Sequence, residues 1–184
     1  MGFHTFDPEK ADKLEDVERY RYISREELVG HLDIATGDTV ADLGSGTGFY
    51  SDDVSPFVEN LYAVDVQNTM HDHYREKGVP ENVSLVTADI SDVPFSDGEL
   101  DAVFSTMTFH EFASDDALAE IARILRPGGR FVVADWTASG RGESGPPVEE
   151  RYDEDKAHEL VTSAGFDVEY EAERPETFIL VAIR

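Results

Sequence analysis

Residues 40–48 read Val40-Ala41-Asp42-Leu43-Gly44-Ser45-Gly46-Thr47-Gly48, an apolar run that leads into three alternate glycines. The run is typical of a buried strand, and the glycines indicate a turn in which the backbone adopts positive φ and approaches a ligand closely. A helix that begins after such a turn presents free N–H groups to a polar ligand. Dinucleotide-binding chains place the third glycine one position later, as G-x-G-x-x-G, so this spacing argues against NAD or FAD.

Short apolar runs alternate with helical stretches on either side of this motif. Strands are predicted at 39–43, 61–66, 83–87, 101–105 and 130–135. The clearest helix is 115–125, which Ser114 can cap and which Pro127-Gly128-Gly129 ends. Because strand and helix alternate, we expect crossover connections and a parallel sheet covered by helices on both faces.

The C-terminal part of the chain follows a different pattern. Two β-rich runs, 166–170 and 177–183, are separated by Arg174-Pro175-Glu176, and this gap is too short for a crossover helix. They therefore predict an antiparallel hairpin at the edge of the sheet. Together with the parallel strands, the hairpin indicates a doubly wound, Rossmann-like α/β fold with a mostly parallel sheet.

A length of 184 residues is enough for about one domain, so we expect a single unit over 1–184. Its first 33 residues are predicted to form a helical lead-in. The loop that starts at Thr137 is rich in glycine and proline and long for a compact domain, which favours a functional role for 137–150.

The net charge of −25 comes from 40 Asp and Glu against 15 Lys and Arg, of which only four are Lys. A globule this anionic repels itself in ordinary salt, whereas about 1 M salt reduces the Debye length to about 3 Å. We therefore interpret the chain as a halophile protein; the alternative is an acidic protein of a mesophile. Either way, the phosphate backbone of a nucleic acid is a poor partner.

Features that the sequence lacks exclude several kinds of site and of protein. There is no Cys, which excludes disulfides, thiolate metal sites and a cysteine nucleophile. The chain starts without a basic stretch followed by an apolar one and has no run of 18 apolar residues, so we expect a cytoplasmic protein without membrane insertion. His71 and His73 lie on different faces of a helix; we interpret both as solvated and expect no metal site.

Two carboxylates follow the next two predicted strands. Asp65 lies 21 positions after Gly44, where an acidic side chain can accept both hydroxyls of a ribose. Asp89 comes just past the third strand, where it can accept the amino group of an adenine. With the glycine turn, these positions predict a ligand that contains a nucleoside.

The glycine motif, the strand end Tyr62-Ala63-Val64-Asp65, Ala88-Asp89 and the segments 101–105 and 125–133 occur in the order and spacing of a known family. The chain resembles the class I S-adenosylmethionine-dependent methyltransferases, in particular the small branch similar to the quinone-biosynthesis (type 11) enzymes. The resemblance implies a seven-stranded sheet of order 3-2-1-4-5-7-6, S-adenosyl-L-methionine as cofactor and methyl transfer to a small-molecule acceptor.

The resemblance also implies a set of site residues. Five of them surround the methionine part of the cofactor: Asp42, Gly44, Ser45, Gly46 and Thr47. Four bind the nucleoside, with Asp65 and Val66 at the ribose and Asp89 and Ile90 at the adenine. Ser105 and Thr106 end the fourth strand beside the methyl-transfer crevice.

Roles for several candidates stay open on the sequence alone. His110 is the best candidate for a general base, because imidazole titrates near neutral pH, but it can equally pack beneath the cofactor. Asp42 either contacts the cofactor or holds its own loop. Asp135 and Trp136 can face the acceptor, although a Trp here is more often part of the core.

Two other functions compete with methyl transfer. One is a non-catalytic subunit that only binds S-adenosylmethionine or S-adenosylhomocysteine, and the other is an NAD-dependent oxidoreductase. The acceptor is expected to be small, because the fourth strand is not followed by Asn or Asp and then Pro-Pro-Tyr, the signature of amino-group methylases of adenine, cytosine and glutamine. The oligomeric state does not follow from the sequence.

The charge leads to a test of stability. If the acidic surface reflects adaptation to high salt, the unfolding temperature rises steeply between low salt and molar KCl, because screening removes the repulsion. Thermal unfolding followed by circular dichroism over a KCl series measures this. A flat profile would contradict the halophile interpretation.

Overall fold

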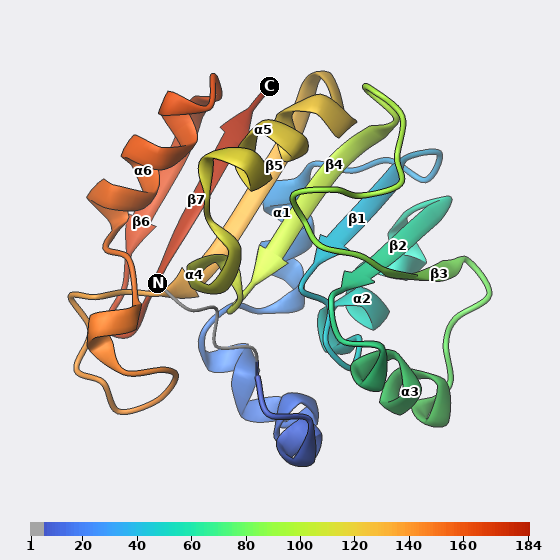
Figure 1. Cartoon of the computed structure of the whole chain (residues 1–184), viewed down its shortest axis with the longest axis horizontal. Helices are drawn as coiled ribbons and strands as arrows, with labels where there is room; N and C mark the ends of the chain where they lie inside the picture. The colour runs from blue at the N-terminus through green and yellow to red at the C-terminus, as the bar shows by residue number, and fades with distance from the viewer. Residues whose placement is uncertain (1–5) are drawn as a thin grey trace.

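The computed structural model describes residues 6–184 and contains a seven-stranded sheet of order β3-β2-β1-β4-β5-β7-β6. Its first five strands are parallel, and β7 runs antiparallel to both β5 and β6 (Figure 1). This confirms the predicted strand order and terminal hairpin. The strands are β1 Thr39–Leu43, β2 Asn60–Asp65, β3 Val83–Thr87, β4 Leu100–Thr106, β5 Leu125–Trp136, β6 Asp167–Glu173 and β7 Thr177–Ile183.

Helices cover both faces of the sheet and bury two apolar cores. One core lies between the sheet and the helices α4 Phe109–Phe112, α5 Asp115–Ile124 and α6 Glu154–Ser163. The other lies between the opposite face and α1 Arg25–Leu32, α2 Phe49–Val54 and α3 Asn68–Lys77. Because both faces are buried, the central strands β1 and β4 are apolar on both sides, as their sequences predicted.

Helix α5 has the predicted start but not the predicted end. The Ser114 side chain accepts a hydrogen bond from the backbone N–H of Ala117 and caps the helix. The helix stops at Ile124, and Leu125 already pairs with Leu100 of β4. Pro127-Gly128-Gly129 therefore lies in the irregular beginning of β5, where the register shifts, and does not itself end the helix.

The N-terminal lead-in is made largely of 3-10 turns. It contains Pro8–Glu15 and Val17–Arg21, which pass below the carboxyl ends of the central strands, and then the one α-helix α1, which packs on a face of the sheet (Figure 1). Only Ala11 is buried within the two turns. Glu15 pairs with Lys77, and Tyr20 packs against Phe49, so both polar and aromatic contacts attach the turns. Just before them, the carbonyl of Phe6 accepts a hydrogen bond from Gln67. Residues 1–5 of the predicted lead-in lie outside the described residues.

Arg151 and Glu176 hold the loop after β5, and the Glu176 carboxylate accepts from the N–H groups of Arg141 and Gly142. The Arg151 guanidinium donates to the carbonyls of Thr137, Ser144 and Pro146, and its side chain is almost fully buried. A short 3-10 turn, Val148–Glu150, closes the loop before α6. Within residues 6–184, no helix combines the length and apolarity needed to cross a membrane.

Two glycines provide a matched test of whether positive φ and close packing require glycine in the turn after β1. Gly48 has φ +81°, and a Cβ there would lie 2.1 Å from the Tyr74 ring, whereas Gly30 is exposed in α1 with nothing within 4 Å. We expect Gly48→Ala to lower the free energy of unfolding by at least about 1 kcal/mol through strain and overlap. Gly30→Ala should raise it by about 0.5–1 kcal/mol. Denaturant unfolding of both variants measures the two effects, and equal shifts would contradict the argument.

Candidate active site

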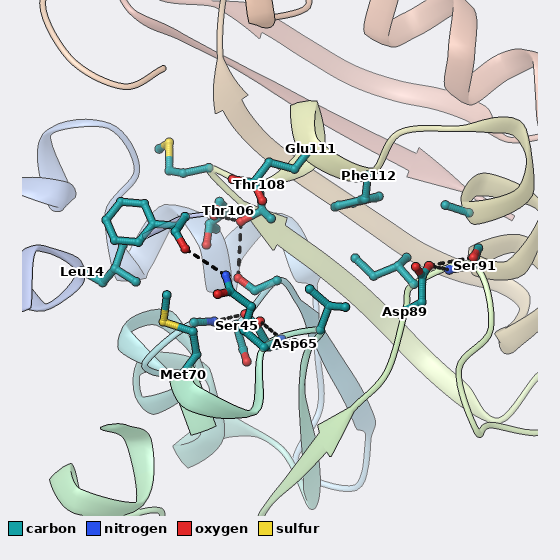
Figure 2. Close-up of a pocket in the computed structure, with 18 of the residues that line it drawn as sticks. Leu14, Ser45, Asp65, Met70, Asp89, Ser91, Thr106, Thr108, Glu111 and Phe112 are labelled. Carbon is teal, nitrogen blue, oxygen red and sulfur yellow. Dashed lines mark hydrogen bonds between the residues drawn. The ribbon is translucent and has the colours of Figure 1, made fainter. Parts of the chain in front are cut away.

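A cavity of about 520 Å³ lies at the carboxyl ends of β1, β2, β3 and β4 (Figure 2). Parallel α/β sheets bind ligands at this edge, where the strand order reverses between β1 and β4. Eight of the eleven predicted cofactor residues line the cavity. They are Gly44, Ser45, Gly46, Asp65, Val66, Asp89, Ile90 and Thr106.

The glycine turn forms the floor of the cavity. The N–H groups of Gly44 and Ser45 both donate to the carbonyl of Val64, at 2.9 and 3.0 Å, and so fix the turn to β2. At Gly44, φ is +77°, and a Cβ would lie 2.4 Å from the Thr108 side chain. The buried Ser45 hydroxyl has no partner among the described residues. A side chain at Gly44 would thus push the Thr108 side chain out of its place in the cavity wall. The Ser45 hydroxyl remains free to form a hydrogen bond with a ligand.

Asp65 connects this turn to the end of β2. Its Oδ2 accepts from the Gly46 N–H and its Oδ1 from the Gln67 N–H, each at 2.8 Å. Burial raises the pKa of Asp65, although the two backbone N–H groups act in the opposite direction. Each oxygen keeps a lone pair for a further donor, and a ribose presents two neighbouring hydroxyls.

Asp89 lies at the far end of the cavity, after β3 (Figure 2). Its Oδ1 accepts from both the backbone N–H and the hydroxyl of Ser91, at 2.9 and 2.7 Å. These bonds lower the pKa of Asp89 and keep it charged. Its Oδ2 has no partner among residues 6–184, so it is available to an amino group of the ligand.

Three predicted cofactor residues lie behind the cavity wall. Asp42 is buried and its Oδ2 accepts from the Ser51 hydroxyl at 2.6 Å; burial raises its pKa to about 7. Thr47 donates to Glu15 of the lead-in, and Ser105 is buried with its hydroxyl unpartnered among the described residues. The contact of Asp42 favours the second of its two roles, holding its own loop.

His110 makes a hydrogen bond with Asp135 beside the cavity. Its Nδ1 lies 2.9 Å from Asp135 Oδ2, which also accepts the backbone N–H of His110 at 2.6 Å. Burial lowers the pKa of His110, but the carboxylates of Asp135 and Glu111 outweigh it, so the pKa is raised overall. The His110 ring does not line the cavity. Its Nε2 lies 3.9 Å from the carboxylate of Glu111, and Glu111 does line the cavity.

Several lining residues were not anticipated from the sequence. Glu111 lines the cavity, and burial raises its pKa to about 7. Phe6, Leu14 and Arg19 of the lead-in also line it. For Glu111, the only sequence signal of a role in the site was an acidic residue next to the predicted His110. The sequence pattern of the lead-in gave no signal for Phe6, Leu14 or Arg19.

Trp136 lies under the loop after β5 and does not line the cavity. Its ring packs against Tyr22 at 4.7 Å between centroids, and Arg151 lies 5.5 Å from it. A Cβ at Gly145 would lie 2.4 Å from the Trp136 ring, so the loop rests directly on the indole. The long loop thus covers the end of β5.

The prediction that His71 is solvated is wrong. His71 is fully buried, its Nδ1 lies 3.0 Å from the Thr87 hydroxyl, and its Nε2 has no partner in the described part of the chain. The face of α3 that carries Met70 and Tyr74 packs on the sheet, and His71 adjoins that face. Within residues 6–184, no cluster of His, Asp and Glu side chains has the arrangement of a metal site.

The profile of a family described as "Methyltransferase domain" matches residues 41–133, which include the glycine turn, Asp65, Asp89 and His110. The chain belongs to this family. Membership confirms the resemblance to type 11 methyltransferases and identifies S-adenosyl-L-methionine as the cofactor. The cavity fits this molecule, because the Asp65 carboxylate, the unpartnered Ser45 hydroxyl and the close approach at Gly44 suit a nucleoside with a polar tail.

Known proteins resemble the chain over different lengths. An S-adenosylmethionine-dependent methyltransferase from Aquifex aeolicus is 31% identical, with a TM-score of 0.88 over 97% of this chain and 98% of that one. A sterol 24-C-methyltransferase from Yarrowia lipolytica is 27% identical over 78% of this chain and 43% of its own length. A ubiquinone/menaquinone C-methyltransferase from Ectopseudomonas mendocina is 32% identical over 58% and 45%. The chain thus spans less than half of these curated relatives.

The His110–Asp135 pair gives a pH-dependent prediction. Asp135→Asn keeps an oxygen for the His110 N–H but removes the negative charge, so we expect it to lower the pKa of His110. A folded-state pKa above the unfolded value, about 6.5 for His, stabilises the fold below that value and loses this contribution as pH rises through the folded pKa. The stability difference between wild type and variant should therefore shrink as the pH rises.

Imidazole NMR titration measures the pKa, and denaturant unfolding at several pH values measures the stability. Asp155→Asn, at an exposed position on α6, serves as the control. An unchanged His110 titration in the Asp135 variant would contradict the effect of the Asp135 charge on the imidazole.

Proposed function

We propose that this protein transfers the methyl group of S-adenosyl-L-methionine to a small-molecule acceptor, with His110 as general base. The observation that carries the proposal is the continuous cavity in which the glycine turn, Asp65 and Asp89 follow three neighbouring strands, with the His110–Asp135 pair beside it. When bound, the cofactor supplies a methyl group already activated by a sulfonium. The protein's main task is therefore to align that group with the acceptor and to exclude water.

Each cofactor-facing residue has a specific task. Asp65 accepts the ribose hydroxyls, and Asp89 accepts the adenine amino group. The glycine turn lets the backbone approach the polar tail, with Val66, Ile90 and Thr106 completing the walls. This division follows the order of the strands, so the reactive end of the cofactor would lie near β4.

His110 acts only where the acceptor must lose a proton. Its raised pKa makes it a stronger base than an ordinary histidine, and Asp135 holds the ring and stabilises the imidazolium that forms. The proton would arrive at Nε2, the nitrogen that does not face Asp135. Glu111 lies between this nitrogen and the cavity and connects the two.

The acceptor is proposed to be a small organic molecule that enters beneath the 137–150 loop. Relatives named for sterol and for ubiquinone/menaquinone C-methylation support this size class. The net charge of −25 argues against nucleic acid and, with the scarcity of Lys, supports a halophile cytoplasm. The length of 184 residues supports a single working unit over 1–184. The rival functions are a non-catalytic cofactor-binding subunit and an NAD-dependent oxidoreductase, which the glycine spacing disfavours.

Calorimetric titration in molar KCl with S-adenosylmethionine, S-adenosylhomocysteine and NAD tests the cofactor. Micromolar binding of the first two is expected, and Asp65→Ala should weaken it about tenfold or more, because charge-assisted hydrogen bonds are lost. Because the same carboxylate also holds the Gly46 and Gln67 N–H groups, thermal unfolding of Asp65→Ala without ligand records any loss of folding separately. Asp155→Ala, at an exposed position, should bind as wild type. Binding of NAD alone would contradict the proposal.

Turnover on a panel of small acceptors tests the chemistry. His110→Ala should lower kcat by about 10²–10⁴-fold on an acceptor that must lose a proton, with cofactor affinity unchanged. Tight S-adenosylhomocysteine binding without turnover on any acceptor would favour the non-catalytic subunit instead.

A further inference from the structure

Nearly every cation of this acidic chain contacts a carboxylate. Of its 15 Lys and Arg, twelve lie within 4.0 Å of an Asp or Glu oxygen. Among residues 6–184, the others are Lys13 and Arg184, both exposed, and Arg19. Residues 1–5 contain no Asp or Glu, so they cannot supply the missing partner. Arg19 is therefore exceptional as a half-buried cation without an ion pair.

Arg19 lies at the wall of the cofactor cavity. Its guanidinium carbon is 5.0 Å from the Phe49 ring and 4.9 Å from the Tyr50 ring, so two aromatic side chains of α2 fix its position. Its Nη1 donates to the Leu14 carbonyl at 2.7 Å, the one hydrogen bond that its side chain donates within the described residues. A guanidinium has five N–H donors in a planar fork, so most of this capacity is unused.

The electrostatics of the position favour a negatively charged ligand. Burial lowers the pKa of Arg19, because the charged form loses hydration, while Tyr50, Asp42 and Glu15 act in the opposite direction from a distance. Asp42 already accepts from Ser51, and Glu15 from Thr47 and Lys77. Neither carboxylate lies within ion-pair distance of Arg19, so an anion in the cavity would complete its coordination.

The position of Arg19 along the cavity indicates which part of the cofactor would lie next to its guanidinium. Asp65 and Asp89, at the ends of β2 and β3, suit the ribose and the adenine. Leu14, next to Arg19, lies 3.1 Å from where a Cβ on Gly46 would be, so this part of the lead-in covers the glycine turn. The cofactor's remaining end is an amino acid, which carries a carboxylate.

We propose that Arg19 binds the carboxylate of the cofactor's methionine moiety and so makes the N-terminal lead-in part of the binding site. The assignment rests on the proposed function. Arg is suited to this task because its parallel N–H groups match the two oxygens of a carboxylate. Arg19 lies outside the matched family segment 41–133, so this contact would be contributed by the lead-in of this chain.

The test compares two ligands that differ at the amino-acid end. S-adenosylhomocysteine carries the carboxylate, and 5′-methylthioadenosine has the same nucleoside and thioether without it. For Arg19→Gln we expect the affinity for S-adenosylhomocysteine to fall about ten- to a hundredfold, and that for methylthioadenosine to change less than twofold. Arg19→Lys should fall between, because a lysine keeps the charge but loses the fork.

Arg21→Gln is the matched control, since Arg21 lies on the same turn, is exposed and pairs with Glu18. It should leave both affinities unchanged. Because each variant is measured with both ligands, a general loss of folding lowers both affinities and is recognised as such. Thermal unfolding of each variant without ligand records that loss separately.

Equal changes for the two ligands, or no change for either, would overturn the assignment and leave Arg19 a structural residue packed on Phe49 and Tyr50. Failure of the wild type to bind either ligand would instead contradict the proposed function, and this assignment with it. The two failures are therefore distinguishable in one set of titrations.

Discussion

The Asp65 carboxylate determines how the rest of the site is arranged. One oxygen binds the Gly46 N–H in the turn after β1, and the other binds the Gln67 N–H at the end of β2. Both bonds are buried or partly buried, so little water competes with them. Two separate loops are thus held at a fixed distance by one side chain, and the same oxygens keep lone pairs directed at the cavity. Architecture and ligand recognition therefore depend on the same group.

Most of the sheet was predictable because its signals are local. The run 39–43 matched its strand at both ends, since a strand buried on both faces has to be apolar and a glycine turn has to follow it. Ser114 marked the start of α5 because a cap needs only a hydroxyl three residues before a free N–H. The hairpin followed from a gap too short for any crossover.

The sequence predictions were wrong where tertiary contacts determine the burial of a side chain or the end of a helix. His71 is polar and sits among polar neighbours in the sequence, but the face of α3 next to it packs on β2 and β3, and Thr87 offers a hydroxyl to its ring. Pro127-Gly128-Gly129 looked like a helix terminator, yet the pairing of Leu125 with Leu100 had already started β5. The roles of Glu111 and Arg19 depend on which cavity their side chains reach, and no spacing along the chain encodes that.

Salt is expected to have opposite effects on the stability of the whole fold and on the attachment of the N-terminal lead-in. The core gains from screening, since a net charge of −25 repels itself. The two 3-10 turns of the lead-in bury only Ala11 and are attached in part by polar contacts, among them the Glu15–Lys77 ion pair. That pair is partly exposed and weakens as salt rises. Two other contacts do not join opposite full charges and are less sensitive to screening. They are the hydrogen bond from Gln67 to the Phe6 carbonyl and the stacking of the Arg19 guanidinium on Phe49 and Tyr50. At molar salt these short-range contacts would therefore keep more of their strength than the Glu15–Lys77 ion pair.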